Sequence, residues 1–448
     1  MIDQTLEAIP ERISALMPDI RVELERLVRI PSVSFPEFDP EQVRRSAAAT
    51  EEILQACGMQ TRLLEVEGAH PAVLGQVPAP NGAPTVLLYA HHDVQPQGPE
   101  DLWASPPFEP VERNGRLYGR GSSDDKAGIV MHAAAMRAWD GRPPVGVTVF
   151  VEGEEESSSE HLGAFLTNYG DLLKADAVIL ADSGNWRTGE PALTISLRGI
   201  VACFVEVRTL DHAVHSGEYG GAIPDALTTL CRTLAALHDD RGNVALSGLA
   251  SGPADPLDLT EEELRDWAGV RPGVTLIGEG TLTERMWTKP AISVLGIDAP
   301  RTPEASNQLV PFARAKVSMR IPPGQDADEA MDALVKHLKS SVPWGAEVKI
   351  VREGVGSPFA LEAEGTAYDA MRRAMTEAFG KKPVLMGAGG SIPFVAEFAR
   401  QFPKATLMLT GAGDPKCNAH SEDESVDLAD LEKSCLAEAL FLGYLAQS

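Results

Sequence analysis

Four short apolar runs recur along this chain and limit what it can fold into. They read TVLLYA, GVTVFVE, DAVILAD and ATLMLTG, and they lie at residues 85–90, 146–152, 176–182 and 405–411. Each run is rich in β-forming residues and is bounded by Gly, Pro or Asp. Continuous apolar runs of this length are typical of strands that are buried on both faces of a parallel sheet.

Helical spacing fills much of the chain around these runs. It predicts helices at residues 3–30, 41–57, 125–139 and 391–402. Strands that alternate with helices are typical of an α/β fold in which helices cover the sheet. We therefore expect a doubly wound α/β domain.

The stretch from 198 to 352 has a different pattern. Its segments follow the order βαββαβ, with strand-like residues at 198–210, 291–297, 313–322 and 346–353 and helix-like residues at 224–240 and 326–341. That order is the ferredoxin-like pattern. Residues 241–290 form a loop-rich insertion within it, with one short acidic helix. We expect a smaller α+β domain at 198–352, inserted into a catalytic domain made of 1–197 and 353–448.

Composition narrows the classes of partner and compartment. The chain has 448 residues and a net charge of −26, which argues against nucleic acid and anionic membranes as partners. No stretch approaches the ~20 apolar residues of a membrane span, and the N-terminus does not resemble a secretory signal. The five cysteines are scattered and never spaced as CxxC. They predict reduced thiols in a cytoplasmic protein and argue against a zinc–thiolate site.

Polar residues follow the predicted strands, where ligands bind in open α/β sheets. In chain order these residues are His91, His92 and Asp93; Glu154, Glu155 and Glu156; Asp182; and His420. Asp124 and Asp125 lie between the first two strands, at the start of a predicted helix. Taken singly, each has an ordinary explanation as a loop residue or a helix cap. Together, carboxylates that converge on one sheet edge repel one another unless cations lie among them.

The mixture of ligand types indicates which metal such a site would hold. Histidines with carboxylates and no cysteine suit zinc in a hydrolytic site, and cobalt and manganese are the alternatives. Two ions about 3.5–4 Å apart, which share a carboxylate, form a known hydrolytic device.

The ordered motifs resemble one family over nearly the whole chain. They are HHDVQP, YGRGSSDDKAG, EGEEESSS, ADSGN, HSGEYGG, GAGGSIP and NAHSEDE. They are similar to those of the di-zinc metallopeptidase family of carnosinase, cytosolic non-specific dipeptidase, carboxypeptidase G, acetylornithine deacetylase and succinyl-diaminopimelate desuccinylase. The resemblance implies a zinc-peptidase catalytic domain with an inserted lid and dimerisation domain, and a homodimer that forms through the lid.

The resemblance also implies a role for each matching residue. The metal ligands would be His91, Asp124, Glu156, Asp182 and His420, with Asp124 bridging two divalent ions. Asp93 would orient the His91 ring, and Glu155 would act as the general base. In the lid, His215 would polarise the scissile carbonyl. Arg320, Gly389, Gly390 and Ser391 would hold the substrate's carboxylate.

Several stretches resemble the dipeptidase branch, and the insertion at 241–290 also fits it. We therefore expect a metal-dependent dipeptidase that acts on dipeptides or short peptides. The alternative is an N-acyl amino acid deacylase with the same chemistry, and a non-catalytic binding protein is a third hypothesis. Three departures from the family pattern are Ala127, Ser158 and Gln308, of which Gln308 bears on substrate preference. We expect His92 to lie beside the site and His132 to be structural.

Overall fold

The computed structural model describes residues 2–80, 82–390 and 392–448, and the chain divides into two compact units. The first unit runs up to Ile195 and includes Leu361–Met386 and Pro393–Ser448. The second unit comprises Ser196–Ala360 and Gly387–Ile392. Each unit is described separately below.

The first unit is built on a mixed sheet with the strand order β1-β2-β6-β3-β7-β17-β8-β15, and β16 pairs with β8. Its centre consists of β6 (Gly146–Glu152), β3 (Thr85–His91), β7 (Ala177–Leu180) and β17 (Thr406–Leu409), which run parallel. These are the four apolar runs, so the prediction of a buried parallel sheet is confirmed. The flanking strands are β1 (Gln60–Leu64), β2 (Ala72–Val77), β8 (Ala192–Leu197), β16 (Val384–Ala388) and β15 (Phe359–Ala360). The chain passes into the second unit within β8 and within β16, and the residues of β15 belong to the second unit.

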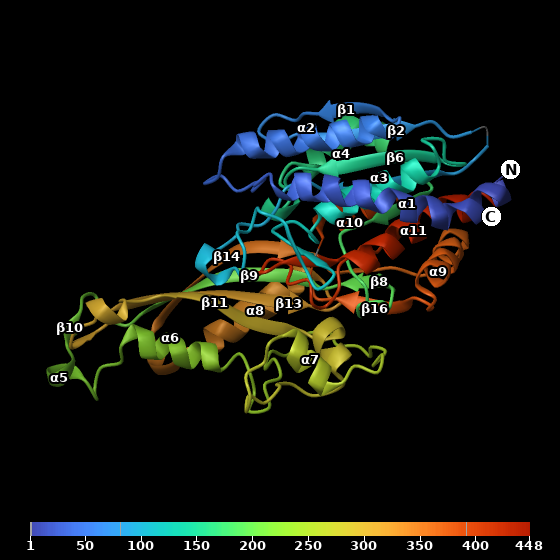
Figure 1. Ribbon diagram of the computed structural model, residues 1–448. Coiled ribbons are helices and arrows are strands. Elements are labelled where there is room, and N and C mark those ends of the chain that lie inside the picture. The colour runs from blue at the N-terminus through green and yellow to red at the C-terminus, as the bar shows by residue number, and fades with distance from the viewer. Residues whose placement is uncertain (1, 81, 391) are drawn as a thin grey trace. The chain divides into compact units, whose positions relative to one another are not determined.

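Helices pack on both faces of this sheet, as a doubly wound fold requires. Val86, Leu88 and Ala90 of β3 join one large apolar core with residues from five helices. These helices are α1 (Ile2–Val28), α2 (Pro40–Ala56), α3 (Lys126–Ala138), α9 (Thr366–Phe379) and α11 (Leu428–Leu445). Tyr89 points to the other face, because side chains alternate along a strand. There its ring stacks on Phe394, with ring centroids 4.0 Å apart. That face is covered by α4 (Leu162–Leu173) and α10 (Pro393–Gln401) (Figure 1).

A small antiparallel sheet fixes two loops of the first unit. It comprises β4 (Val111–Arg113), β5 (Arg116–Tyr118) and β18 (Ser425–Asp427), in the order β18-β5-β4. Its register pairs Ser425 with Tyr118. The pairing brings the chain just after His420 against the chain just before Asp124, although about 300 residues separate them in the sequence.

The second unit has the predicted ferredoxin-like arrangement. Its antiparallel sheet has the order β11-β13-β9-β14, formed by β9 (Gly199–Arg208), β11 (Ala291–Asp298), β13 (Phe312–Ile321) and β14 (Glu347–Gly356). One face packs on α6 (Ala226–Ala235) and α8 (Ala327–Ser341), and Figure 1 shows both helices beside the strands. In chain order the strands are therefore arranged 4-1-3-2, with the two helices as the crossovers.

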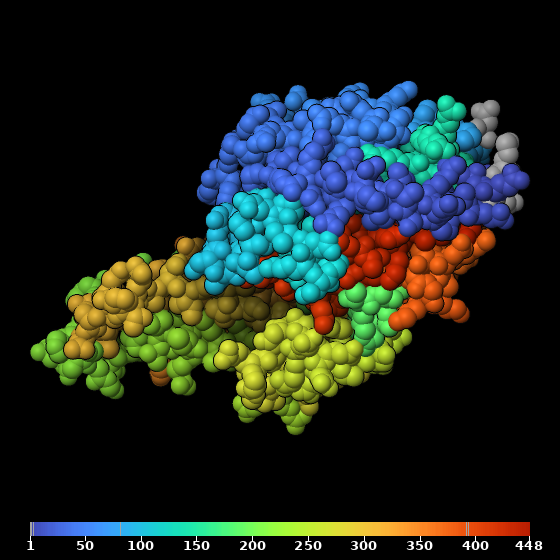
Figure 2. Space-filling view, viewed as in Figure 1, coloured from blue at the N-terminus to red at the C-terminus, as the bar shows by residue number. Residues whose placement is uncertain are grey.

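Shorter elements complete the second unit. They are β10 (Val214–His215), α5 (Ser216–Tyr219), α7 (Glu261–Trp267) and β12 (Gln308–Leu309). The insertion at 241–290 is loop-rich, as expected, and it forms part of the unit's surface, yellow in Figure 2. Its short acidic helix α7 begins with a capping box between Thr260 and Glu263.

Side-chain caps explain where several longer helices begin. Asp39 caps α2, Asp225 caps α6, Asp326 caps α8 and Asp427 caps α11. Each carboxylate accepts a hydrogen bond from a backbone N–H in the first turn, which would otherwise lack a partner. No helix in the described part of the chain is long and apolar enough to cross a bilayer.

Candidate metal centre

His91 is the last residue of β3, and its ring lies between two carboxylates. Its Nε2 is 3.1 Å from Oδ1 of Asp124, and its Nδ1 is 3.4 Å from Oδ1 of Asp93. The ring is fully buried. Burial opposes its charged form, but Asp124 and Asp93 outweigh that effect and raise the pKa of His91. The ring is thus held with Nε2 directed at Asp124.

Asp124 is the centre of the cluster. Its second oxygen lies 3.0 Å from Nε2 of His420, and that nitrogen lies 3.3 Å from Oε2 of Glu156. Two groups of ligand atoms therefore share the Asp124 carboxylate, and the atoms of each group lie within 4.8 Å of one another. The groups are His91, Asp124 and Asp182, and Asp124, Glu156 and His420. A shared carboxylate is the geometry that a pair of metal ions requires.

Asp93 connects the His91 ring to the acidic turn after β6. Its carboxylate accepts hydrogen bonds from the backbone N–H groups of Glu155 and Glu156, at 3.2 and 3.0 Å. The Ser34 hydroxyl donates to it at 2.7 Å. One buried carboxylate thus orients both an imidazole and the turn that carries two glutamates.

His92 points away from this cluster. Its Nε2 lies 2.9 Å from the carbonyl oxygen of Pro71, and burial lowers its pKa to about 4. His132 lies within α3 and pairs with Glu438, 2.9 Å away. Neither histidine belongs to a group of ligand atoms.

The acids of the cluster lie in an environment that disfavours their charges. Burial raises the pKa of Glu155 well above its usual range, and the charge of Asp182 adds to the rise. Burial likewise raises the pKa of Asp182 and of Glu156. Hydrogen bonds to Asp124 and Glu156 raise the pKa of His420 to about 11. A divalent cation would replace the protons that this cluster otherwise retains.

Glu155 differs from its neighbour Glu156. It belongs to neither group of ligand atoms, although its pKa responds to the charges of Asp182 and Glu156. Two adjacent glutamates on a tight turn therefore have different surroundings. A carboxylate beside a metal cluster but outside its ligand set is suited to proton transfer.

Glu424 is a residue of this site that the sequence patterns did not single out. It is fully buried, and its carboxylate accepts hydrogen bonds from the backbone N–H groups of Gly121, Ser123 and Asp124, at 2.9, 2.9 and 3.0 Å. The buried guanidinium of Arg120 donates to it at 2.7 Å. Arg120 in the GRGSSDD motif signals that an acid must lie nearby, but the sequence does not indicate which one.

The remaining predicted residues lie in the second unit. His215 is exposed, and its Nδ1 accepts a hydrogen bond from the backbone N–H of Gly217 at 3.1 Å. The neutral ring therefore carries its proton on Nε2. Arg320 is half-buried on β13, and Gly389 and Gly390 follow β16. Ser391 lies outside the described residues.

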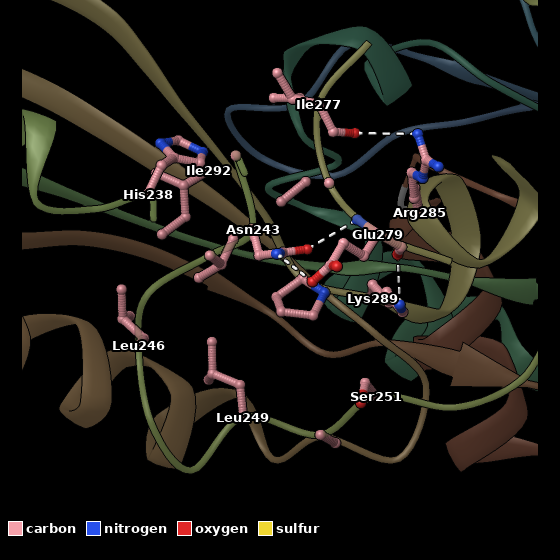
Figure 3. Close-up of a pocket in the computed structure, with 16 residues that line it drawn as sticks. His238, Asn243, Leu246, Leu249, Ser251, Ile277, Glu279, Arg285, Lys289 and Ile292 are labelled. Carbon is pink, nitrogen blue, oxygen red and sulfur yellow. Dashed lines mark hydrogen bonds between the residues drawn. The ribbon is translucent and has the colours of Figure 1, made fainter. Parts of the chain in front are cut away.

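A cavity of about 300 Å³ lies in the second unit, beside the start of β11. Its polar groups bond to one another, as Figure 3 shows: Asn243 bonds to Glu279, and Lys289 donates to the Glu279 carbonyl oxygen at 2.6 Å. Arg285 donates to the carbonyl oxygen of Ile277. Among the described residues that line this cavity, Glu279 is the only acid. It therefore lacks the paired carboxylates of the cluster around Asp124.

The sheet, the shared carboxylate and the separate glutamate together define a metal-dependent hydrolase. The chain belongs to peptidase family M20/M25/M40, whose model matches residues 87–442.

Its relatives agree in length and fold. A cysteinylglycine-S-conjugate dipeptidase from Corynebacterium striatum is 35% identical over 437 residues, which cover 93% of this chain and 95% of the relative. Among solved structures, the dipeptidase Dug1p from Saccharomyces cerevisiae gives a TM-score of 0.86 at 24% identity and covers 99% of both chains. Human carnosine dipeptidase 1 gives a TM-score of 0.85 at 24% identity, again over 99% of both chains.

Proposed function

We propose that this protein is a dipeptidase that hydrolyses the amide bond of dipeptides with the help of two divalent ions. The observation that carries the proposal is the carboxylate of Asp124, which the two groups of ligand atoms share. The names of its relatives, a cysteinylglycine-S-conjugate dipeptidase and the dipeptidase Dug1p, support the substrate class.

His91, Asp124 and Asp182 would hold one ion, and Asp124, Glu156 and His420 the other. The ligands are imidazoles and carboxylates without a thiolate, which supports zinc, with cobalt and manganese as alternatives. When bound, the ions would supply Lewis acidity and would lower the pKa of a water molecule at the site.

In this mechanism Glu155 moves the proton. Its carboxylate takes a proton from the attacking water and later delivers it to the nitrogen of the leaving amine. Its buried position beside Asp182 supports this role, because a carboxylate with a raised pKa is a stronger base and takes up a proton more readily. His215 would donate a hydrogen bond from its Nε2–H to the scissile carbonyl oxygen, which stabilises the negative charge that develops there.

The substrate's carboxylate would be held by Arg320, Gly389, Gly390 and Ser391. A guanidinium forms paired hydrogen bonds with a carboxylate, and a glycine turn lets backbone N–H groups approach an anion closely.

Two further features belong to the proposal. The protein would form a homodimer through its second unit, supported by the exposed side chains of Val294, Leu295 and Ile297 on the edge strand β11. It would act in the cytoplasm, supported by its cysteines, all of which carry free thiols.

A substrate panel on metal-reconstituted protein tests the proposed function. The protein is loaded separately with zinc, cobalt and manganese and is assayed with dipeptides and with N-acetyl and N-succinyl amino acids. Dipeptides should be the better substrates. Hydrolysis of the acyl amino acids alone would instead identify a deacylase, and no hydrolysis with any metal would contradict both functions.

A further inference from the structure

Arg198 is a half-buried arginine whose guanidinium pairs with no carboxylate of the described residues. It lies in the second unit, between the end of β8 and the start of β9. Its Nε and Nη1 atoms are buried and form no hydrogen bond within the structure. A buried polar group without a partner is destabilising, and a charged one is more so. Such a group therefore indicates that a hydrogen-bond acceptor from outside the described protein atoms binds it.

A second arginine lies close by. Ile200, two residues after Arg198, is directly opposite Arg320 in the pairing of β9 with β13. Burial lowers the pKa of Arg198 to about 10, and the positive charge of Arg320 adds to that effect. Burial also lowers the pKa of Arg320. In the described part of the chain no carboxylate pairs with either guanidinium, although acids outnumber Lys and Arg by 65 to 39.

The glycine turn after β16 is shaped around Arg198. The backbone N–H of Arg198 donates to the carbonyl oxygen of Ala388 at 3.2 Å. A Cβ atom at Gly389 would lie 2.8 Å from Nη2 of Arg198, closer than side chains approach. Gly389 therefore leaves room for the guanidinium, which places Arg198 beside the turn that we proposed to hold the substrate's carboxylate.

Arg314, in the same unit, lies in different surroundings, although its Nε, like that of Arg198, forms no hydrogen bond. Its guanidinium carbon stacks over the ring of Phe204, 3.9 Å from the ring centroid, and its Nε lies 3.5 Å from a carboxylate oxygen of Glu206. Arg314 thus has both an aromatic face and an anion. No carboxylate of the described residues pairs with Arg198, so a structural ion pair does not explain this arginine.

We propose that Arg198 is a second cationic contact for the α-carboxylate of the substrate, alongside Arg320. This inference rests on the proposed function for its substrate. Two guanidinium groups beside a glycine turn supply several N–H donors. Together these donors can bind both oxygens of one carboxylate and fix its orientation. Arg198 therefore makes the site specific for a free C-terminal carboxylate, and a C-terminal amide binds poorly.

The test measures binding without turnover. In a metal-loaded Glu155→Gln background, calorimetry gives the dissociation constants of alanylglycine and alanylglycinamide. Adding Arg198→Gln should weaken the binding of alanylglycine about 10- to 100-fold and change that of alanylglycinamide less than about twofold. Adding Arg314→Gln is the matched control, because it removes a cation from the same sheet but should leave both constants unchanged.

Two further measurements distinguish a role of Arg198 in substrate binding from a structural role. Arg198→Lys retains the charge but loses the planar fork, and it should weaken alanylglycine binding by a smaller factor than Arg198→Gln. In otherwise unmutated enzyme, Arg198→Gln should raise KM for alanylglycine and leave kcat nearly unchanged, the pattern of lost ground-state binding. The Arg198→Lys result decides the question if Arg198→Gln does not fold.

Equal binding of alanylglycine with and without Arg198→Gln would overturn the inference. So would the same loss for alanylglycinamide as for alanylglycine, because that pattern marks a structural arginine. Failure of the proposed function gives a different result. The unmutated enzyme would then hydrolyse no dipeptide, but the binding measurements would still show a preference for the free carboxylate that depends on Arg198.

Discussion

The carboxylate of Glu424 accepts a hydrogen bond from the backbone N–H of Asp124, with 3.0 Å between the two atoms. Glu424 follows His420 by four residues, and its own backbone carbonyl accepts a hydrogen bond from Gly119 at 2.9 Å. One buried side chain thus connects the loop that carries Asp124 to the loop that carries His420. The distance between these two metal-ligand candidates depends on Glu424.

Glu424→Gln should weaken metal binding. The amide keeps the shape of the side chain but places an NH2 group among N–H donors and leaves the buried Arg120 without an anion. We expect zinc affinity, measured by chelator competition, to fall about 10- to 100-fold. The free energy of unfolding of metal-free protein, measured in urea, should fall by about 3–5 kcal/mol.

Glu438→Gln is the matched control for this prediction. Glu438 is almost completely buried and lies 2.9 Å from His132, so its loss also breaks a buried pair. It should lower stability but leave zinc affinity unchanged. Equal zinc affinity in the Glu424→Gln and Glu438→Gln variants would show that Glu424 has only a structural role.

Metal stoichiometry should distinguish the shared ligand from an unshared one. Asp124→Asn removes a ligand from both groups, so the dialysed variant should retain neither ion. Asp182→Asn removes a ligand from one group only and should retain about one ion of the pair. Elemental analysis gives the ratio of zinc to protein. An Asp124→Asn variant that keeps one tightly bound ion would contradict a bridging role for Asp124.

Glu155→Gln should separate metal binding from turnover. Because Glu155 lies outside both groups of ligand atoms, its amide variant should bind the same amount of metal. Without a carboxylate to accept the proton, kcat for a dipeptide should fall about 10²- to 10⁴-fold. The checks are elemental analysis and steady-state kinetics on the same preparation. Full activity in the variant would exclude Glu155 as the base.

The grouping of the metal ligands could be predicted because parallel strands bring their carboxyl ends to one edge. His91 ends β3, the turn that carries Glu156 follows β6, and Asp182 follows β7. Strand patterns are local, so the apolar runs and the polar residues behind them are enough to predict this edge. The roles of these residues and the domain bounds at 198 and 352 stay predictions.

The contacts of Glu424 and Arg198 could not be predicted in the same way. Glu424 reaches Asp124 through the pairing of β18 with β5, two three-residue strands that are distant in the sequence and too short for a clear pattern. Arg198 is one arginine at a strand boundary, and only the structure shows that no acid among the described residues pairs with it. Long-range pairing and the absence of a partner leave no local signal in a sequence.

Glu152 should make the stability of the metal-free protein depend on pH. Its carboxyl is fully buried, and the Tyr89 hydroxyl donates to one of its oxygens at 2.8 Å. Burial is the main cause that raises its pKa from 4.5 to about 7. Between these values the unfolded chain has lost the proton and the folded chain still holds it. The free energy of unfolding should therefore fall by about 3 kcal/mol as pH rises through this window.

Glu152→Gln removes this titration and keeps an oxygen that accepts from Tyr89. Urea unfolding of both proteins between pH 4 and pH 8, without metal, isolates the effect as the difference between the two curves. Near pH 4 the two free energies should be similar, and above about pH 7 the variant should be the more stable by about 3 kcal/mol. A difference that stays constant across this range would show that Glu152 ionises in the folded protein as it does in the unfolded chain.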